Sequence, residues 1–362
     1  MTFSTQKPWL DAYPDGVPHE IDTSSFRNLA HLLETSFKKN ATSPFSVCMD
    51  RWMTYGEVDA ASASMGAWLQ HLGLPAGARV AIMLPNIPQF AVTMAAILRA
   101  GYTCVNVNPL YTARELEHQL KDSGASAIVI LENFAHTLSE VIEHTQIQHT
   151  VLASMGDLLG PVYGRWITFA VRHLAKMVPE FELPLSDKHK VTSFKAALAA
   201  GRQQSFKAVP QSLDDIAFLQ YTGGTTGLSK GAVLTHRNIV AAILQAETWF
   251  APALERLPDL RKVNSIAALP LYHIFALTLC FLAMRQGSHL TLVPNPRDFA
   301  KFIETLKKRP FHMLPGVNTL FNALLQHPMF KSVDFSNLCL TQAGGMAASE
   351  GTARAWQSAT GS

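Results

Sequence analysis

The sequence predicts an α/β protein in which mostly parallel sheets carry helices on their faces. Two observations support this class. Short apolar runs alternate with helix-like segments along most of the chain, and 48% of the 362 residues are hydrophobic while only 16% are charged. Because single cores stop growing at about 250–300 residues, we expect one large lobe or two to three packed subdomains.

The first alternating region covers residues 77–131. Its apolar runs are short and continuous, which indicates buried strands, and a glycine closes each helix-like segment between them. Strands that alternate with helices in this way favour parallel pairing through crossover helices. The predicted strands are 79–84, 103–107 and 126–131, and the predicted helices are 89–100 and 113–123.

A second alternating region begins after a less regular stretch at 151–209, which we interpret as an insertion. We therefore expect an N-terminal extension with a first helix (1–50), a first α/β subdomain (51–209) and a second one (210–362). The predicted strands are 216–221, 265–269, 289–293, 311–314 and 338–341, and the predicted helices are 239–250, 298–308, 317–326 and 347–358.

Charge and cysteine content exclude several classes of protein. The net charge is +3 and no Lys/Arg block occurs, which argues against nucleic-acid binding. The cysteines lie far apart in apolar surroundings without a CxxC pair, so we expect buried, reduced thiols of a cytosolic protein instead of a metal or disulfide framework. No signal-peptide pattern and no uncharged run of about 18–20 apolar residues is present. The four cysteines are Cys48, Cys104, Cys280 and Cys339.

The strongest local feature is the string YTGGTTGLSKGA at Tyr221–Ala232, directly after a predicted strand. Glycines let the backbone turn tightly and bring its N–H groups close to a ligand. Threonine hydroxyls add donors, and Lys230 adds a positive charge. Together these groups predict a cradle for a polyphosphate. The contributing residues are Thr222, Gly223, Gly224, Thr225, Thr226, Gly227 and Lys230.

This spacing differs from the Walker pattern GxxxxGK[ST], which has glycine before the lysine and a hydroxyl after it. Here Ser229 precedes Lys230 and Gly231 follows it, so the loop is of a different class. The alternative interpretation is an ordinary Gly/Thr surface turn. The length of the complete string argues against a chance match.

At these residues the chain resembles the adenylate-forming superfamily, which includes acyl-CoA synthetases and whose loop reads [YF][ST][SG]G[ST]TGxPKG. Ser229 stands where that pattern usually has proline. Further segments resemble other family motifs in the same order, and two of them are most similar to bacterial long-chain fatty acid–CoA ligases. The general motifs are MTYGEV (53–58), LRAGYTCVNVNPLYT (98–112), LPLYHIF (269–275) and QAGGM (342–346), and the two ligase-like segments are VPNPRD (293–298) and PGVNTLFNALL (315–325).

The resemblance implies the large N-terminal lobe of the acyl-CoA synthetase fold, with stacked, mostly parallel sheets in αβαβα layers. It implies a two-step reaction as well. A fatty acid carboxylate attacks ATP to give acyl-AMP and pyrophosphate, and the thiol of coenzyme A then displaces AMP. Mg²⁺ is expected to arrive with ATP, and no metal ligands are assigned in this chain. A homodimer is one assembly that the resemblance allows.

The resemblance also assigns roles to individual residues. Thr222 and Lys230 would act on the phosphates together with the rest of the loop and Tyr221, and Gly344, Gly345 and Met346 would present backbone to adenine. His273 matches the position beside the substrate carboxylate; the alternative is a helix-start histidine with a satisfied hydrogen bond. His236 is interpreted as a structural cap of the next helix. Candidate acyl-pocket residues, each of which could equally belong to the core, are Ile274, Phe275, Leu277, Gly316, Val317 and Leu320.

The segment Tyr163–Val178 combines large apolar residues with Arg165, Arg172 and Lys176. It is too short and too charged to span a bilayer. Its content suits a helix on an anionic membrane surface, such as the inner face of the cytoplasmic membrane. An amphipathic helix packed on the core is the alternative.

The sequence ends before several segments that the resemblance implies: a Gly-Tyr-Gly-x-Thr-Glu string, a ribose-binding aspartate, a hinge and a small C-terminal lobe with a catalytic lysine. We therefore expect a fragment that cannot complete the reaction alone. Two rival functions remain open at this point. One is a ligase for medium-chain, aryl or carrier-bound acids, and the other is a non-catalytic lobe that binds nucleotide or acyl ligands.

Overall fold

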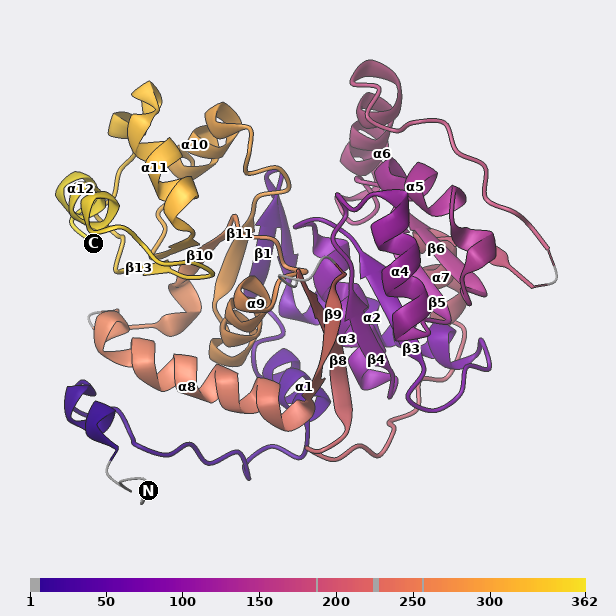
Figure 1. The fold of residues 1–362 in the computed structure, drawn as a ribbon, viewed down its shortest axis with the longest axis horizontal. Coiled ribbons are helices and arrows are strands. Elements are labelled where there is room, and N and C mark those ends of the chain that lie inside the picture. Colours follow the sequence, from indigo (N-terminus) through magenta and orange to yellow (C-terminus); the bar gives the residue numbers. More distant parts are fainter. Residues whose placement is uncertain (1–6, 187, 224–227, 256) are drawn as a thin grey trace.

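The computed structural model describes residues 7–186, 188–223, 228–255 and 257–362 (Figure 1). Two sheets form its centre, and within them only the β1–β2 and β8–β9 pairs are antiparallel. The first sheet has the order β7 (Lys190–Ser193), β6 (His149–Ala153), β5 (Ala127–Leu131), β3 (Arg79–Met83), β4 (Thr103–Asn106), β8 (Ile216–Thr222) and β9 (Lys230–Thr235). The second has the order β13 (Leu340–Ala343), β12 (Met313–Gly316), β10 (Asn264–Ala267), β11 (His289–Leu292), β1 (Pro44–Cys48) and β2 (Arg51–Thr54).

Helices cover both faces of each sheet. In β3, Val80 and Ile82 belong to the central core, whereas Ala81 and Met83 face the core under α4, because successive side chains of a strand point to opposite faces. The outer layers contain α4 (Ala113–Ser123) and α5 (Ala135–Ser139) on one side and α10 (Phe299–Lys307), α11 (Asn318–Gln326) and α12 (Glu350–Thr360) on the other. The central helices are α1 (Leu29–Lys39), α2 (Tyr55–Gln70), α3 (Pro88–Arg99), α7 (Phe194–Gly201), α8 (His236–Leu254) and α9 (Ile274–Gln286).

This arrangement confirms the predicted α/β class with mostly parallel sheets and helical layers. The predicted strands and helices all occur, with ends shifted by a few residues. Sequence reasoning missed α9 because this helix is apolar on all sides and shows no amphipathic period. It also missed α2, α7, β1, β2, β6, β7 and β9.

The strands do not divide between the sheets as the expected subdomains would. Strands β8 and β9 pair with the sheet of the first subdomain, and β1 and β2 pair with the sheet of the second. The expected boundaries at 50–51 and 209–210 therefore do not separate the two sheets. A composition shift marks where a chain bends, whereas backbone pairing decides which sheet a strand joins.

The expected helix at 163–178 is shorter than predicted. Helix α6 covers Pro161–Phe169 and continues as a π-helical turn, Ala170–Leu174, and Lys176 follows with a left-handed φ of 50°. We call residues 161–177 the α6 segment; it stands out at the top of the molecule in Figure 1. Among the described residues, no helix is both long and apolar enough to cross a membrane.

Candidate functional site

The residues singled out by the sequence follow the carboxyl ends of β8, β10, β12 and β13. Carboxyl ends of parallel strands form the usual ligand-binding crevice of α/β folds. One buried side chain links the two sheets here: Nε2 of Gln220, on β8, donates to the carbonyl oxygen of Tyr272, in the β10–α9 connection, at 3.0 Å. Strand β8, which leads into the glycine-rich string, is thereby held beside the β10–α9 connection of the second sheet.

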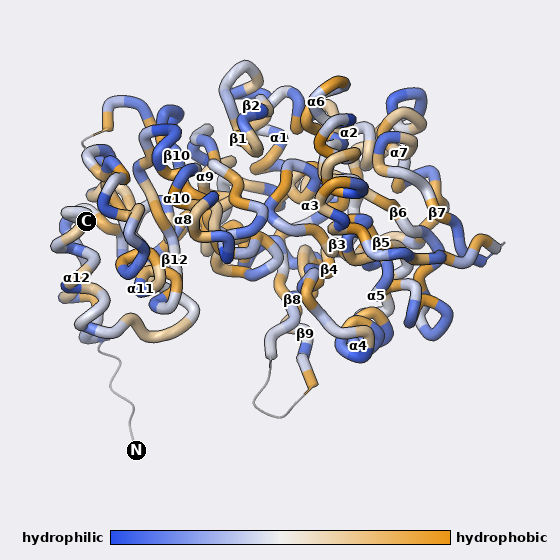
Figure 2. Tube along the Cα trace, turned by 90° about the horizontal axis from the view of Figure 1, so that it is seen from above, coloured by the Kyte–Doolittle hydropathy of each residue, from blue (hydrophilic) through white to orange (hydrophobic). Residues whose placement is uncertain are grey.

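The glycine-rich string forms the turn of the β8–β9 hairpin, in which Thr222 pairs with Lys230. The described ends of both strands project from the body of the molecule (Figure 2). The side chain of Lys230 is exposed, as are Thr222 and Gly223. The remaining loop residues predicted to bind phosphate lie outside the described residues; they are Gly224, Thr225, Thr226 and Gly227.

Tyr221 supports the hairpin from inside. Its hydroxyl donates to Oδ2 of Asp122 on α4 at 2.6 Å, and burial raises the pKa of this tyrosine above its ordinary value. Its ring leaves no room for a side chain opposite, since a Cβ atom at Gly231 would lie 2.9 Å from it. The structure therefore gives Tyr221 a positioning contact, whereas the sequence suggested a place among the ligand-binding groups.

A cavity of about 490 Å³ opens beside the hairpin. Gly223, Leu228 and Ser229 form one wall, and Arg114 and His118 from α4 contribute to the other. Nε2 of His118 lies 2.9 Å from the carbonyl oxygen of Ser229, which fixes the distance between the walls. Arg114 is exposed and brings to this cavity a guanidinium group, which can bind an anion with two parallel hydrogen bonds. Sequence reasoning missed both α4 residues, because only the fold brings this helix to the loop.

The two glycines of QAGGM lie against groups from the second sheet. The N–H of Gly344 donates to the carbonyl oxygen of Gly316 at 3.2 Å, and a Cβ atom at Gly344 would approach the ring of Phe275 to 2.8 Å. Gly345 has a φ of 73° and lies close to Val317. Three predicted segments, 269–275, 315–325 and 342–346, thus meet at one edge of the sheet. Met346 is exposed beside them.

His273 caps α9. Its Nδ1 accepts a hydrogen bond from the backbone N–H of Phe275 at 3.4 Å. The backbone N–H of His273 donates to the carbonyl oxygen of Pro270. The imidazole is nevertheless exposed at the carboxyl edge of the sheet. Because the cap accounts for Nδ1, a contact to a substrate carboxylate would use Nε2.

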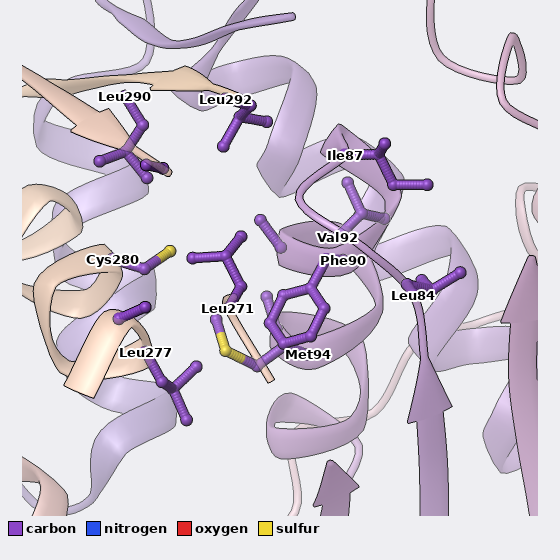
Figure 3. Close-up of a cluster of buried hydrophobic side chains, with 14 of the residues drawn as sticks. Leu84, Ile87, Phe90, Val92, Met94, Leu271, Leu277, Cys280, Leu290 and Leu292 are labelled. Carbon is purple, nitrogen blue, oxygen red and sulfur yellow. The ribbon is translucent and has the colours of Figure 1, made fainter. Parts of the chain in front are cut away.

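The candidate acyl-pocket residues separate into two groups. Ile274, Phe275 and Val317 are half-buried, and Leu320 is 9% exposed. Leu277 is fully buried beside Leu271 and Cys280, in the core that α3 and β11 share with α9 (Figure 3). Leu277 is therefore a residue of the hydrophobic core, the alternative that the sequence left open for each acyl-pocket candidate.

Asn86 holds the β10–α9 connection and was also missed by sequence reasoning. Its Nδ2 donates to the carbonyl oxygens of Ala267 and Leu269, both at 2.8 Å, and its Oδ1 accepts from the N–H of Leu271 at 2.8 Å. The available signal was its position, because a polar residue that directly follows a buried strand lies at the ligand-binding edge.

His236 is structural, but it is not the cap. Thr235 and Asn238 form the capping box of α8, and His236 is the first helical residue. Its Nδ1 accepts a hydrogen bond from the N–H of Leu29 at 3.2 Å, and burial lowers its pKa to about 4. The histidine therefore ties α1 to α8 as a neutral imidazole.

Carboxylates are the side chains that would hold Mg²⁺. Within the described ranges, no group of three His, Cys, Asp or Glu side chains is placed to hold a metal ion. Glu115, a carboxylate at the 490 Å³ cavity, accepts hydrogen bonds from the N–H and the hydroxyl of Thr112.

Comparison with known proteins adds three findings. The sequence profile of the family described as AMP-binding enzyme matches residues 33–362. A long-chain-fatty-acid–CoA ligase of Escherichia coli O157:H7 is 45% identical over 358 residues, which are 98% of this chain and 62% of that protein. The chain thus spans less than two thirds of the length of this relative.

Solved structures show the same fold. A crystal structure of an anthranilate–CoA ligase with anthranoyl-AMP superposes with a TM-score of 0.76 at 21% identity, covering 94% of this chain and 60% of that one. A long-chain-fatty-acid–CoA ligase from Archaeoglobus fulgidus gives a TM-score of 0.75 at 20% identity, covering 96% and 63%.

Proposed function

Because this chain belongs to the AMP-binding enzyme family, we propose that it forms the nucleotide- and acyl-binding lobe of a ligase that activates a long-chain fatty acid with ATP and transfers the acyl group to coenzyme A. The observation that carries the proposal is the β8–β9 hairpin, which ends in Lys230 and whose strand β8 is joined through Gln220 to Tyr272, next to His273. The 45% identity to a long-chain-fatty-acid–CoA ligase supports the substrate class.

The chemical task is to bring an anionic carboxylate to a polyanion. Lys230, the loop N–H groups and Arg114 would stabilise charge on the phosphates, and positioned donors of this kind supply most of the catalysis in phosphoryl-type reactions. Mg²⁺, bound with ATP, would neutralise further phosphate charge. Nε2 of His273 would orient the carboxylate. We assign the backbone of Gly344, Gly345 and Met346, at the carboxyl edge of the second sheet, to adenine.

The experiment that tests this function is mass-spectrometric detection of acyl-AMP formed from ATP and palmitate by the protein that carries this chain. Lys230→Met should lower its formation by about a hundredfold, because one positioned charge in such a site is worth about 3 kcal/mol. Lys331→Met, an equivalent change at an exposed lysine on the outer layer, should leave the rate unchanged. Equal loss in both variants would contradict the assignment.

Two other functions remain to be separated by the same assay. A panel of medium-chain, aryl and long-chain acids would reveal another acid preference. Binding of ATP without any acyl-AMP would favour the non-catalytic lobe. The exposed Lys230, next to Ser229 of the cavity lining, favours catalysis over that alternative.

We further propose that the protein binds the surface of an anionic membrane through the α6 segment. Its outer apolar side chains, which we call the α6 face, include Val162 (79% exposed), Trp166 (54%), Phe169 (48%) and Leu174 (63%). The segment between Asp157 and Glu180 contains basic residues and no acidic one. Exposed aromatic groups next to cations are typical of helices that lie in the lipid headgroup region.

The membrane proposal is tested by flotation with vesicles that contain phosphatidylglycerol. Trp166→Glu with Phe169→Glu should abolish flotation, and Trp249→Glu, at a similarly exposed tryptophan on α8, should not. Arg172 is a poor choice for mutation, because its Nε donates at 2.9 Å to the buried carboxylate of Glu132. Arg165→Glu with Lys176→Glu tests the charge contribution instead, and unchanged flotation in all variants would refute the proposal.

A further inference from the structure

A second cavity, of about 450 Å³, lies between the α6 segment and the carboxyl end of β11. Its volume is within the range of small-molecule sites. The side chains that form its apolar part come from separate regions of the chain, and three of them are methionines, which adapt their shape to flexible ligands. They are Val47, Met49, Met155, Val171, Met177 and Phe302.

The charged groups that line this cavity balance one another: the carboxylates of Asp50, Asp298 and Glu304 face the cations of Lys301, Lys308 and Arg309. Asp50 pairs with both Lys308 and Arg309 at 2.6 Å, and Asp298 pairs with Lys301 at 3.1 Å. Each of these cations is paired, and the lining has no net positive charge to attract a phosphate or another anion. The cavity therefore suits a hydrocarbon chain better than an ionic ligand.

The segment VPNPRD forms one side of this cavity. Val293, Pro294, Asn295 and Asp298 line it. They follow β11, which pairs with β10, the strand that leads into the β10–α9 connection and His273. A motif for which the adenylation chemistry gives no role thus lines a cavity next to the strand that leads to the candidate active site.

The α6 segment forms the roof of the cavity and is firmly held. Arg172 bonds to Glu132, whose side chain is 3% exposed, and Nδ2 of Asn133 donates to the carbonyl oxygen of Met177 at 2.8 Å. Val171 and Met177 line the cavity, while Trp166 belongs to the exposed α6 face. The same short segment thus carries apolar groups on the cavity and on the surface.

The backbone conformation of Met49 is separate evidence that the sequence maintains an apolar lining in this cavity. It has a φ of 47° and the next residue, Asp50, has a φ of 62°, so both occupy the left-handed region in the β1–β2 turn. Asparagine and glycine are preferred at such positions, and a methionine is unusual there. The sequence nevertheless places a large apolar side chain at this point, where it lines the cavity.

From these observations we infer that the 450 Å³ cavity binds the hydrocarbon tail of one long-chain fatty acid, which enters from the α6 face. The identity of the ligand rests on the proposed function. The site differs from the acyl pocket at His273 and Val317, and it would hold the substrate tail between the membrane surface and the site of adenylation.

The inference is tested by photo-crosslinking with a palmitate analogue that carries a diazirine in mid-chain, without nucleotide and without vesicles. Mass spectrometry should find labels at Met49, Tyr163 and Met177. Met49→Asn should weaken labelling at Tyr163 and Met177 about fivefold through the loss of apolar contact. It should also preserve or raise the melting temperature, because asparagine suits the left-handed backbone.

A matched pair of variants locates the site on the roof. Val171→Asp should remove the labels, while Leu185→Asp, the same charge introduced at an exposed leucine outside the α6 segment and the cavity lining, should retain them. Labels confined to residues 273–277 and 316–320, or labels unchanged in Met49→Asn and Val171→Asp, would overturn the inference. Failure to form acyl-AMP would instead contradict the proposed ligase function, because the crosslinking requires no catalysis.

Discussion

At the scale of single residues, buried polar groups do most to fix the site. Asn86, Gln220 and His236 each bond to backbone that is distant in sequence. The imidazole of His236 is fully buried and accepts a hydrogen bond, so only its neutral form fits the folded state. Its charge state therefore couples folding to pH.

The pH dependence of folding should reveal His236. Its pKa is about 4 in the folded chain and 6.5 ordinarily, so the unfolded chain takes up a proton first as the pH falls. The folded state therefore loses free energy of unfolding as the pH falls from 6.5 to about 4, and above pH 6.5 this contribution is fully present. In urea unfolding, His236→Gln should reduce the loss between pH 7 and about pH 4.5 by about 2–3 kcal/mol.

The control for this prediction is His19→Gln, at an exposed histidine, which should keep the original pH dependence. His289 contributes a similar loss, because burial also lowers its pKa to about 4, so the variant should retain part of the effect. An unchanged loss in His236→Gln would contradict the assignment.

Residue identities could be predicted only where a motif names them. The loop around Lys230 and the glycines at 344 and 345 could be recognised because glycine is the residue that lets the backbone come closest to another group. Arg114, His118 and Asn86 did not, because their roles depend on which helix or strand lies beside them. Thr235 was overlooked as the N-cap of α8 because the sequence analysis assigned that role to the adjacent His236.

At the scale of elements, amphipathic period and capping explain both successes and failures. Helix α4 was predicted with its observed bounds, because Thr112 and Glu115 form a capping box and Gly124 ends the helix with a φ of 61°. Helix α9 lacks a polar face and was missed. Periodicity detects a helix that has a solvent side and fails for one enclosed between two sheets.

The cap of α4 gives the prediction at this scale. Thr112→Ala removes the acceptor for the N–H of Glu115 and should destabilise the protein by about 1 kcal/mol in urea unfolding. Because α4 carries Arg114 and His118, affinity for nucleotide should also fall. Thr35→Ala, at an exposed position within α1, should change stability by less than about 0.5 kcal/mol. Equal effects of the two variants would argue against the cap.

At the scale of the whole molecule, the two sheets share one core. Val80 and Ile82 of the first sheet belong to the same buried cluster as Ile266 and Leu290 of the second. Phe218 on β8 and Phe281 on α9 meet edge to face with ring centroids 6.1 Å apart, which joins the β8–β9 hairpin to the helix behind the second sheet. Composition predicted a large core, but the exchange of strands between sheets required the structure.

A shared core predicts that both sheets lose stability together. Phe281→Ala should cost about 4 kcal/mol, as truncation of a buried aromatic side chain does. Hydrogen exchange should then accelerate by similar factors at β3 and β10. Trp249→Ala, at an exposed position, should leave both strands protected. Faster exchange in one sheet alone would show that the two sheets unfold separately.

The pairing of β1 with β11 has a consequence for biosynthesis. Ser46 lies beside Leu290, so a strand made early on the ribosome must wait for a partner synthesised 244 residues later. At about 5–20 residues per second this interval is about 10–50 s. During that time β1 can pair with β2 but its other edge stays open, which makes the β1–β2 pair a natural client of chaperones that shield unpaired strands.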